Sequence, residues 1–170
     1  MFTRNFFMLL PATYNYGRKI VNDLGNTVTA SINAGNLNSA EGMLNIVNIR
    51  NNSKDASAWG TSAIIFGVGS GNSTPSLDDY ELEHPILESY LGGSVGYNLT
   101  REDRHPLLIF NLSNNSNDSS NIVNITELGI YWPLRNNGSR YALIFRETFP
   151  SVTIEPGESK QIKILLVPEV

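Results

Sequence analysis

The sequence contains no cysteine among its 170 residues. Disulfide bonds, thiolate nucleophiles and cysteine-ligated metal sites are therefore excluded. Long hydrophobic runs are missing as well, because no apolar stretch approaches the roughly 18 residues that a membrane-spanning helix needs. We expect no membrane partner. The length of the chain indicates one domain, which is large enough to bury a hydrophobic core without covalent cross-links.

Charge is also scarce. Only 16% of the residues are charged, against about 25% in average soluble proteins. The 12 basic residues do not cluster and are outnumbered by 16 acidic ones. Proteins that bind nucleic acids carry basic patches that neutralise phosphates, so we expect no nucleic-acid partner. Between Asp55 and Thr100 there is no lysine or arginine at all.

Asparagine, serine and threonine supply the polarity instead, with 21, 17 and 10 copies. A surface of amides and hydroxyls forms hydrogen bonds without like-charge repulsion. This favours assemblies, extracellular surfaces and sugar-contacting proteins. Eight Asn-x-Ser/Thr sequons occur, which matter only in a secreted protein: Asn51, Asn72, Asn98, Asn111, Asn114, Asn117, Asn124 and Asn137.

Short apolar or alternating runs separated by turn signals dominate the chain from about residue 20. Such runs predict β-strands. The candidates are 28–32, 44–49, 63–66, 107–110, 122–132, 141–147, 152–154 and 162–167. The run 63–66 is continuously apolar, which is typical of a strand buried on both faces. In the last strand, Ile162, Ile164 and Leu166 share one face.

Two sequence motifs in the last third of the chain predict turns. Asn136-Asn137-Gly138-Ser139 predicts a hairpin, because Asn-Gly is the strongest short hairpin signal. Glu155-Pro156-Gly157-Glu158 predicts a type II turn. The pattern as a whole predicts an all-β fold, a sandwich or an open barrel, and of these we favour an antiparallel β-sandwich of jelly-roll or immunoglobulin-like type. We expect one domain over 1–170, with an N-terminal arm over 1–19 and the sandwich over 20–170.

Two segments carry helical signals. Near the N-terminus, Thr3 can cap a short helix whose apolar side includes Phe6 and Phe7. Because so short a helix is unstable alone, its aromatic residues must dock on the domain or on a neighbouring subunit. The second segment is Ser76–Ser89, where we expect a capped helical turn that ends at Pro85.

The motifs of common active sites are missing or incomplete. Gly67-Val68-Gly69-Ser70-Gly71 follows an apolar run, but the third glycine of a dinucleotide-binding loop is replaced by Asn72 and no amphipathic helix follows. We interpret this segment as a glycine-rich turn that leaves a buried strand. His84 and His105 have no metal-ligand spacing and are expected to be exposed loop residues.

Asp78, Asp79, Glu81 and Glu83 form a dense group of carboxylates. We interpret it as the acidic N-terminus of a helical turn. Two alternatives stay open, a structural Ca²⁺ site and the carboxylate pair of a glycoside hydrolase. Since no nucleophile, base or cofactor motif supports catalysis, we predict no enzyme, no catalytic residue, no cofactor and no metal.

Three blocks of the chain carry a family resemblance: Met1–Leu10, Ile65–Ile86, and a third made of Ile125–Tyr131, Leu143–Phe149 and Ile154–Ser159 with the apolar run after it. They resemble small virion structural proteins of tailed bacteriophages and related prokaryotic viruses. The second block matches that family's Gly-x-Gly-x-x-x-x-Pro-x-x-x-Asp-x-x-Leu-x-x-Pro-Ile pattern with a one-residue slip between glycine and proline, and the third matches its Glu-x-Gly-Ile/Leu-Tyr/Phe and Arg-x-x-Phe pattern. The matching positions are Gly67, Gly69, Pro75, Asp79, Leu82, Pro85 and Ile86, then Glu127, Gly129, Ile130, Tyr131, Arg146 and Phe149.

The resemblance implies a virion location and a repeated subunit that contacts copies of itself and other virion proteins. We expect the assembly interface to involve Phe2, Phe6, Phe7, Met8, Glu127 and Arg146. Glu127 and Arg146 lie on the two strands that flank the Asn-Gly turn. They can pair across this hairpin, either within one subunit or at an interface between subunits. If the arm serves only assembly, deleting residues 1–11 should leave a folded monomer.

The alternative function is a receptor- or carbohydrate-binding module on a virion or cell surface, with host surface glycans as its partners. Its polar loops would supply hydrogen bonds, and aromatic residues would supply stacking platforms. The aromatic candidates are Trp59, Tyr90, Tyr97 and Trp132.

Overall fold

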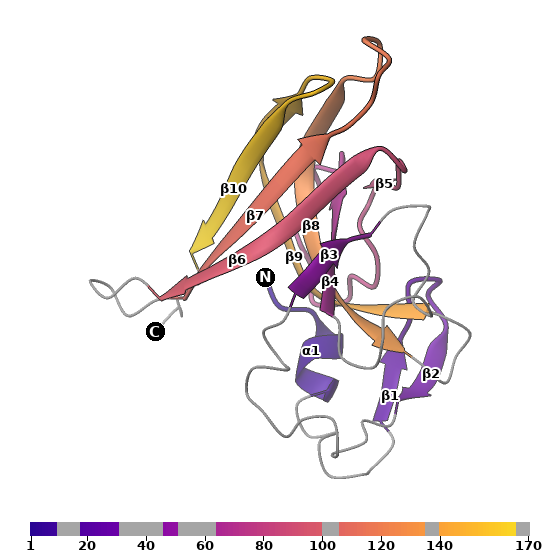
Figure 1. Cartoon of the computed structure of the whole chain (residues 1–170). Helices are drawn as coiled ribbons and strands as arrows, with labels where there is room; N and C mark the ends of the chain where they lie inside the picture. The colour runs from indigo at the N-terminus through magenta and orange to yellow at the C-terminus, as the bar shows by residue number, and fades with distance from the viewer. Residues whose placement is uncertain (10–17, 31–45, 51–63, 100–105, 135–139, 166–170) are drawn as a thin grey trace.

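The computed structural model describes residues 1–9, 18–30, 46–50, 64–99, 106–134 and 140–165 (Figure 1). Most of these residues lie in strands, which confirms the prediction of a β fold, and the one helix among them is α1 (Arg4–Leu9). In this part of the chain no helix has the length and apolarity to cross a membrane. The strands are β1 (Arg18–Val21), β2 (Thr27–Ala30), β3 (Ile46–Ile49), β4 (Ile64–Gly69), β5 (Pro85–Ile86), β6 (Leu91–Leu99), β7 (Pro106–Asn114), β8 (Val123–Leu134), β9 (Arg140–Ile154) and β10 (Ser159–Leu165).

The described strands form three sheets. Strands β1 and β2 make a two-stranded sheet, β10-β7-β6 a three-stranded sheet, and β3-β4-β8-β9 a larger sheet in which β5 also pairs with β4. Every pairing is antiparallel except that of β3 with β4, which run parallel with Ile46 opposite Ile64. The expectation of a purely antiparallel arrangement is therefore wrong at this pair. A parallel pair needs a crossover instead of a hairpin.

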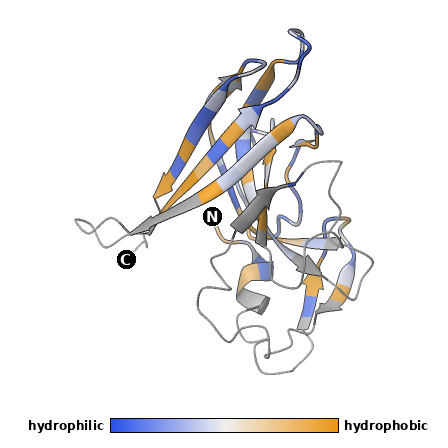
Figure 2. Ribbon diagram, in the orientation of Figure 1, coloured by the Kyte–Doolittle hydropathy of each residue, from blue (hydrophilic) through white to orange (hydrophobic). Residues whose placement is uncertain are grey.

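The main hydrophobic core takes side chains from both larger sheets. Phe66 of β4 and Phe110 of β7 are fully buried, and their ring centroids lie 5.2 Å apart. Burial alternates along β7 and β10, as expected of strands with one buried face, and Figure 2 shows both apolar and polar residues on these two strands. Ile162 is buried and Ile164 packs against the core, which confirms that they share the inner face of the last strand.

The opposite face of β4 and β8 is buried too. Ile65 and Tyr131 form a second cluster there together with Leu82, which belongs to the 70–84 loop (residues 70–84, between β4 and β5). Because Ile65 and Phe66 lie in different clusters, the prediction of a strand buried on both faces is confirmed. The 70–84 loop therefore acts as a cover for this side of the larger sheet.

Three strand predictions need correction. Strand β6 was not expected, because its glycines at positions 92, 93 and 96 disfavour a strand, yet it pairs with β7 along its full length. Strand β1 was not expected either, and the predicted boundary between residues 19 and 20 falls inside it. Strand β9 is continuous where two separate strands were expected. Pairing with a neighbour outweighs local propensity in these cases.

Both predicted turns agree with the described residues. The Glu158 N–H donates to the Glu155 carbonyl over 2.9 Å, and Gly157 has φ 79°. This is the left-handed conformation that the third position of a type II turn requires. The Asn136–Ser139 tip lies outside the described residues, but β8 and β9 pair as a hairpin on both sides of it, with Leu134 opposite Arg140.

The helical turn predicted over Ser76–Ser89 is wrong. The segment makes a single turn, in which the Ser76 hydroxyl accepts a hydrogen bond from the Asp78 N–H and the Asp79 N–H donates to the Ser76 carbonyl. Pro85 then begins strand β5 instead of ending a helix. The carboxylates of this segment turn toward arginines elsewhere in the fold, as described below.

Asn114 organises the polar segment that follows β7. It is fully buried, and its amide donates to the carbonyls of Asn121 and Ile154 over 2.7 and 3.2 Å. A buried side chain with these bonds is not accessible for modification in the folded chain. The sequon at Asn114 is therefore not a glycosylation site of the folded protein.

The N-terminal arm is joined to the rest of the chain. Phe2 forms a β-bridge with Phe145, stacks on Phe6 with ring centroids 4.2 Å apart, and meets the Phe145 ring edge-on at 5.4 Å. Thr3 directly precedes α1, where the sequence places the N-cap, and its carbonyl accepts from the Phe6 N–H over 3.1 Å, while its hydroxyl donates to the Leu143 carbonyl over 2.6 Å. Asn5 is buried and bonds both the N–H and the carbonyl of Val21.

Of the two docking sites expected for the arm, the domain itself is therefore the one that Phe2 and Phe6 occupy. Both residues pack against the main core. The side chains of Phe7 and Met8 lie outside the described residues. A role of these four residues in assembly stays a prediction.

Candidate functional site

Glu127 of β8 is a fully buried carboxylate in the larger sheet. It accepts hydrogen bonds from the backbone N–H groups of Gly71 (3.0 Å), Glu83 (3.1 Å) and His84 (2.8 Å). A fourth bond comes from Arg146 Nε over 2.9 Å. Since an ionised carboxylate is acceptor-only, these four donors satisfy it and fasten the 70–84 loop to β8.

Arg146 of β9 completes this arrangement. It is 2% exposed and lies opposite Gly129, diagonally across the β8–β9 ladder from Glu127. Besides Glu127, its guanidinium donates to Asp79 Oδ2 over 2.9 Å, to the Ser73 hydroxyl over 3.1 Å and to Glu83 Oε2 over 3.4 Å. We call Glu127, Arg146, Asp79, Glu83 and Ser73 the Glu127 network.

The electrostatics of the Glu127 network keep Arg146 charged. Burial alone would lower the pKa of Arg146, but the hydrogen bonds and charges of Asp79 and Glu127 outweigh burial, so its pKa lies above the ordinary value. The backbone N–H and hydroxyl of Ser73, followed by the Asn72 N–H, lower the pKa of Glu83. Both shifts favour the charged forms of Arg146 and Glu83.

The pairing of Glu127 with Arg146 across the hairpin was predicted from sequence, and the structure has it within one chain. Its character differs from that of an ordinary exposed ion pair, because the Glu127 and Arg146 side chains are 0% and 3% exposed. An exposed pair contributes little to stability. A buried charge, in contrast, costs several kcal/mol when its partner is removed.

The glycines of the 67–71 segment make room for Glu127. A Cβ on Gly69 would lie 2.3 Å from Glu127 Oε1 and 2.7 Å from the His84 carbonyl oxygen. A Cβ on Gly71 would lie 2.7 Å from the same Oε1 and 2.5 Å from the Cβ of Glu83. The absence of side chains in this segment thus leaves space for the Glu127 carboxylate. Gly67 and Gly69 lie inside β4 and not in a turn.

We expect Gly69→Ala to lower the free energy of unfolding by about 3 kcal/mol, because overpacking against both a carboxylate and a backbone carbonyl leaves no flexible neighbour to yield. Urea unfolding followed by circular dichroism measures it. Gly157→Ala is the matched control: nothing lies within 4 Å of its added Cβ, so only the positive φ opposes it, at about 1–2 kcal/mol. A smaller loss at Gly69 than at Gly157 would contradict the packing described here.

A second arginine, Arg50, lies beside the first network and is half-buried. Arg50, directly after β3, donates to Glu81 Oε2 over 2.6 Å and to Asp23 Oδ2 over 3.0 Å. Its guanidinium carbon also lies 4.9 Å from the ring centroid of Tyr131 and 5.3 Å from that of Tyr141, a cation–π arrangement. We call these five residues the Arg50 cluster.

The Arg50 cluster joins the β1–β2 turn, the end of β3, the 70–84 loop and the β8–β9 hairpin. The Tyr131 hydroxyl donates to the Glu81 carboxylate. Burial, and after it the charge of Glu81, raise the pKa of Tyr131 well above its usual value. Burial would lower the pKa of Arg50, but Tyr131, Glu81 and Asp23 together raise it. Tyr131 therefore acts as a neutral donor and not as an acid at ordinary pH.

All four carboxylates of the acidic group are paired with arginine. Asp78 pairs with Arg4 at 2.8 Å on the surface, and the other three belong to the Glu127 network or the Arg50 cluster. An open groove of about 500 Å³ runs beside them, lined also by Leu24 and Tyr80. Within the described ranges, no three histidine, aspartate or glutamate side chains are placed to hold a metal ion.

The remaining candidate residues are placed as follows. His84 is exposed, as expected, while its backbone N–H serves Glu127. Tyr90 and Trp132 pack against the main core, which leaves less of their rings for stacking on a sugar. Trp59, His105 and the side chain of Tyr97 lie outside the described residues.

The comparisons with known proteins match nothing. No family model fits the sequence, and neither the curated proteins nor the solved structures contain a significant relative. The virion resemblance therefore stays an expectation.

Sequence reasoning missed most of both arginine sites. Asp79 and Leu82 were noted as motif positions and Glu81 and Glu83 as acidic residues, but Asp23 and Arg50 were not singled out. One signal was present: Glu127 and Arg146 each stand inside an apolar strand run. Since charged residues are almost never fully buried unless paired, such positions indicate an internal partner. The sequence does not say which loop supplies it.

Proposed function

We propose that the chain is a non-enzymatic structural subunit of a phage-like virion, where it contacts copies of itself and other virion proteins. One observation carries the proposal. Two of the three blocks through which the chain resembles virion proteins are far apart in sequence, yet Gly69 and Asp79 of one meet Glu127 and Arg146 of the other. Residues that serve to fix a loop on a sheet fit an architectural protein.

The architecture that goes with this proposal is a β-sandwich of jelly-roll or immunoglobulin-like type. Its two layers are the β10-β7-β6 sheet and the sheet that contains β4, β8 and β9. The shared core and the Phe66–Phe110 contact support it. In a capsid, tail or fibre, such a module supplies a rigid body with free sheet edges.

The pairing of the acidic group with arginines supports the proposal that the subunit is not an enzyme. A glycoside hydrolase needs two carboxylates facing each other across a sugar-binding cleft. Here Asp79, Glu81 and Glu83 are each held by an arginine. The backbone N–H and hydroxyl of Ser73 lower the pKa of Glu83, which makes this carboxylate unsuited to be a general acid.

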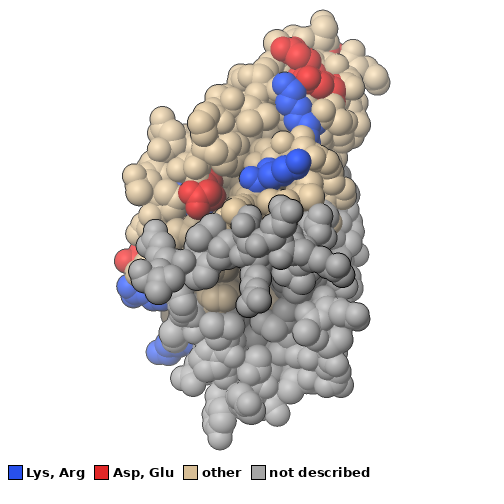
Figure 3. All heavy atoms as spheres, turned by 90° about the vertical axis from the view of Figure 1, so that its left-hand side faces the viewer, with Lys and Arg blue, Asp and Glu red and all other residues tan. Residues whose placement is uncertain are grey.

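The outer face of the three-stranded sheet supports a role in protein contacts. Ser94, Asn111 and Gln161 lie side by side on its three strands, and their side chains form a hydrogen-bonded row. Figure 3 shows few charged side chains over the described part of the side that it views. Such a surface can approach another protein without like-charge repulsion.

The same row favours the second candidate, a module that binds host surface glycans, because amides and hydroxyls are suitable partners for sugar hydroxyls. A glycan array tests it. Binding that is lost in Asn111→Ala would support the glycan function. An array without a binder would remove it.

Quantitative mass spectrometry of purified virus particles from the source tests the virion proposal. We expect the chain at a fixed copy number per particle. Hundreds of copies would indicate a lattice or decoration subunit, and a few to a few dozen would indicate a vertex, tail or fibre component. Absence from purified particles would overturn the proposal.

A further inference from the structure

Among the described strands, β10 forms one edge of the three-stranded sheet. In the sheet order β10-β7-β6, no described strand pairs with its far side, and Figure 1 shows β10 (yellow) at the margin of the molecule. It pairs with β7 over seven consecutive residues without a bulge. An edge of this kind exposes main-chain groups that can bind another strand.

The alternation of hydrogen-bonded pairs between β10 and β7 identifies which main-chain groups of β10 point away from the sheet. The Asn114 N–H donates to the Glu158 carbonyl, so this opposed pair is a hydrogen-bonded one. Because such pairs alternate along an antiparallel ladder, the main chains of Lys160, Ile162 and Ile164 face β7. The N–H and carbonyl groups of the alternate residues point away from the sheet. These are Ser159, Gln161, Lys163 and Leu165, whose side chains are also exposed.

We propose that β10 pairs antiparallel with β10 of a second copy of this chain, about a two-fold axis at Ile162. This inference rests on the proposed function, which requires contacts between copies, and it names the surface that they use. Ile162 is the midpoint of Ser159–Leu165. The register centred on it is therefore the one that pairs all seven residues of both strands.

The side chains fit this register on both faces. On the inner face Ile162 meets its own copy, so the apolar row of Val95, Phe110 and Ile162 continues into the second subunit. On the outer face Lys163 lies opposite the second copy's Gln161. The Gln161 amide nitrogen already donates to Asn111 over 2.9 Å, and the oxygen of the same amide can accept from the lysine.

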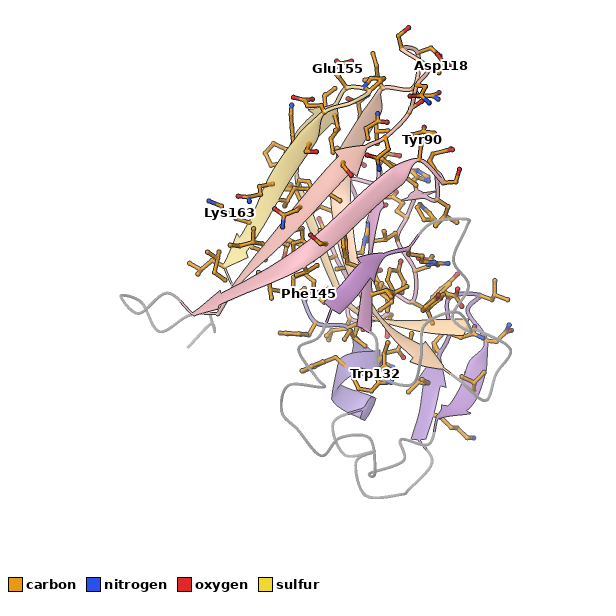
Figure 4. All side chains as sticks on the ribbon, viewed as in Figure 1. Tyr90, Asp118, Trp132, Phe145, Glu155 and Lys163 are labelled. Carbon is orange, nitrogen blue, oxygen red and sulfur yellow. The ribbon has the colours of Figure 1, made fainter. Side chains whose placement is uncertain are left out.

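The two lysines of β10 select this register. Lysines on an edge strand oppose unwanted pairing. Registers centred on Lys160 or Lys163 would place two like charges directly opposite, which is destabilising. In the register centred on Ile162, Lys160 lies opposite Ile164 and remains paired with Glu158 of its own chain at 3.3 Å. Figure 4 shows Lys163 pointing away from the molecule.

Disulfide trapping tests the pairing, because the chain has no cysteine of its own. Gln161→Cys and Lys163→Cys are prepared as separate proteins, both at exposed positions. In the proposed register these two residues are opposed, with Cα atoms about 5.5 Å apart, within disulfide reach. We expect the mixture to form about tenfold more disulfide dimer under mild oxidation than either protein alone.

Two controls make the result specific. Ser94→Cys is exposed on the outer face of β6, at the other edge of the same sheet, and its mixture with Gln161→Cys should stay at background. In analytical ultracentrifugation, Lys163→Pro should weaken the dimer of the unmodified chain about tenfold or more, since proline removes an outward N–H and leaves the bonds to β7 intact. Lys163→Ala should keep the dimer.

Equal trapping in all mixtures, or a monomer at high micromolar concentration, would overturn the pairing. These results are separable from the virion proposal. A chain that is counted in purified particles but does not trap would refute the edge pairing alone. A chain that traps but is absent from particles would refute the virion role alone.

Discussion

Arg146→Met is expected to lower the free energy of unfolding by about 3–5 kcal/mol, the range found when one partner of a buried ion pair is removed. The substitution leaves Glu127 fully buried with three backbone donors and no cation. It also releases Asp79 and Glu83, which fasten the 70–84 loop to the sheet. Because methionine is a long side chain like arginine, the loss of stability reflects the missing charge and hydrogen bonds more than a change in side-chain volume.

Arg4→Met is the matched control, because Arg4 also pairs with a carboxylate but its side chain is 67% exposed. We expect it to change the free energy of unfolding by at most about 1 kcal/mol. Urea denaturation at neutral pH measures both variants. Equal effects at Arg4 and Arg146 would contradict the burial of the Glu127 network.

A double variant separates pairing from burial. Glu127→Gln removes the carboxylate charge but keeps an acceptor oxygen for the loop. In the background of Arg146→Met, this second change should recover part of the lost stability, because no uncompensated charge remains buried. A further loss comparable to the first would mean that the two residues act independently.

Deletion of residues 2–9 is expected to unfold the monomer, or to leave it only marginally stable. The arm contributes the packing of Phe2 and Phe6 against the core and the buried bonds of Thr3 and Asn5. These sum to about 5 kcal/mol, near the lower end of the total stability of a domain. The sequence-based expectation was a folded monomer, and circular dichroism of the truncated chain decides between the two.

Asn5→Ala keeps the arm and tests how it is attached. The substitution leaves the part-buried N–H and carbonyl of Val21 without the Asn5 amide, and the loss of these two hydrogen bonds costs about 1–3 kcal/mol. A stable truncated chain together with a neutral Asn5→Ala would show that the arm is dispensable for folding. That outcome would support the prediction that the arm serves in assembly between subunits.

Much of the strand content could be predicted because it depends on nearest neighbours in the chain. The apolar runs at β4 and β7, the alternation along β10 and the Pro-Gly turn before it are local patterns, and each is present in the fold. Strand β6 could not be predicted in this way. Its glycines have no strand preference, and it is ordered by its neighbour β7.

The candidate site shows the same division. The sequence indicated that Glu127 and Arg146 would face each other, because they stand on the two strands of one predicted hairpin. It gave no indication of Asp79 and Glu83 as further partners of Arg146, since these carboxylates come from a loop that returns over the sheet from a distant part of the chain. A local pattern cannot specify a contact of that kind.

By itself, therefore, the sequence determined the β character, the lack of cysteine chemistry, the low charge and the hairpin that carries the central ion pair. Only the tertiary structure decided that this pair is buried, that two glycines open the space for its carboxylate, and that the acidic group is held by arginines. The physical reason is that burial depends on what covers a residue. Here the cover is the 70–84 loop, whose path follows from long-range packing.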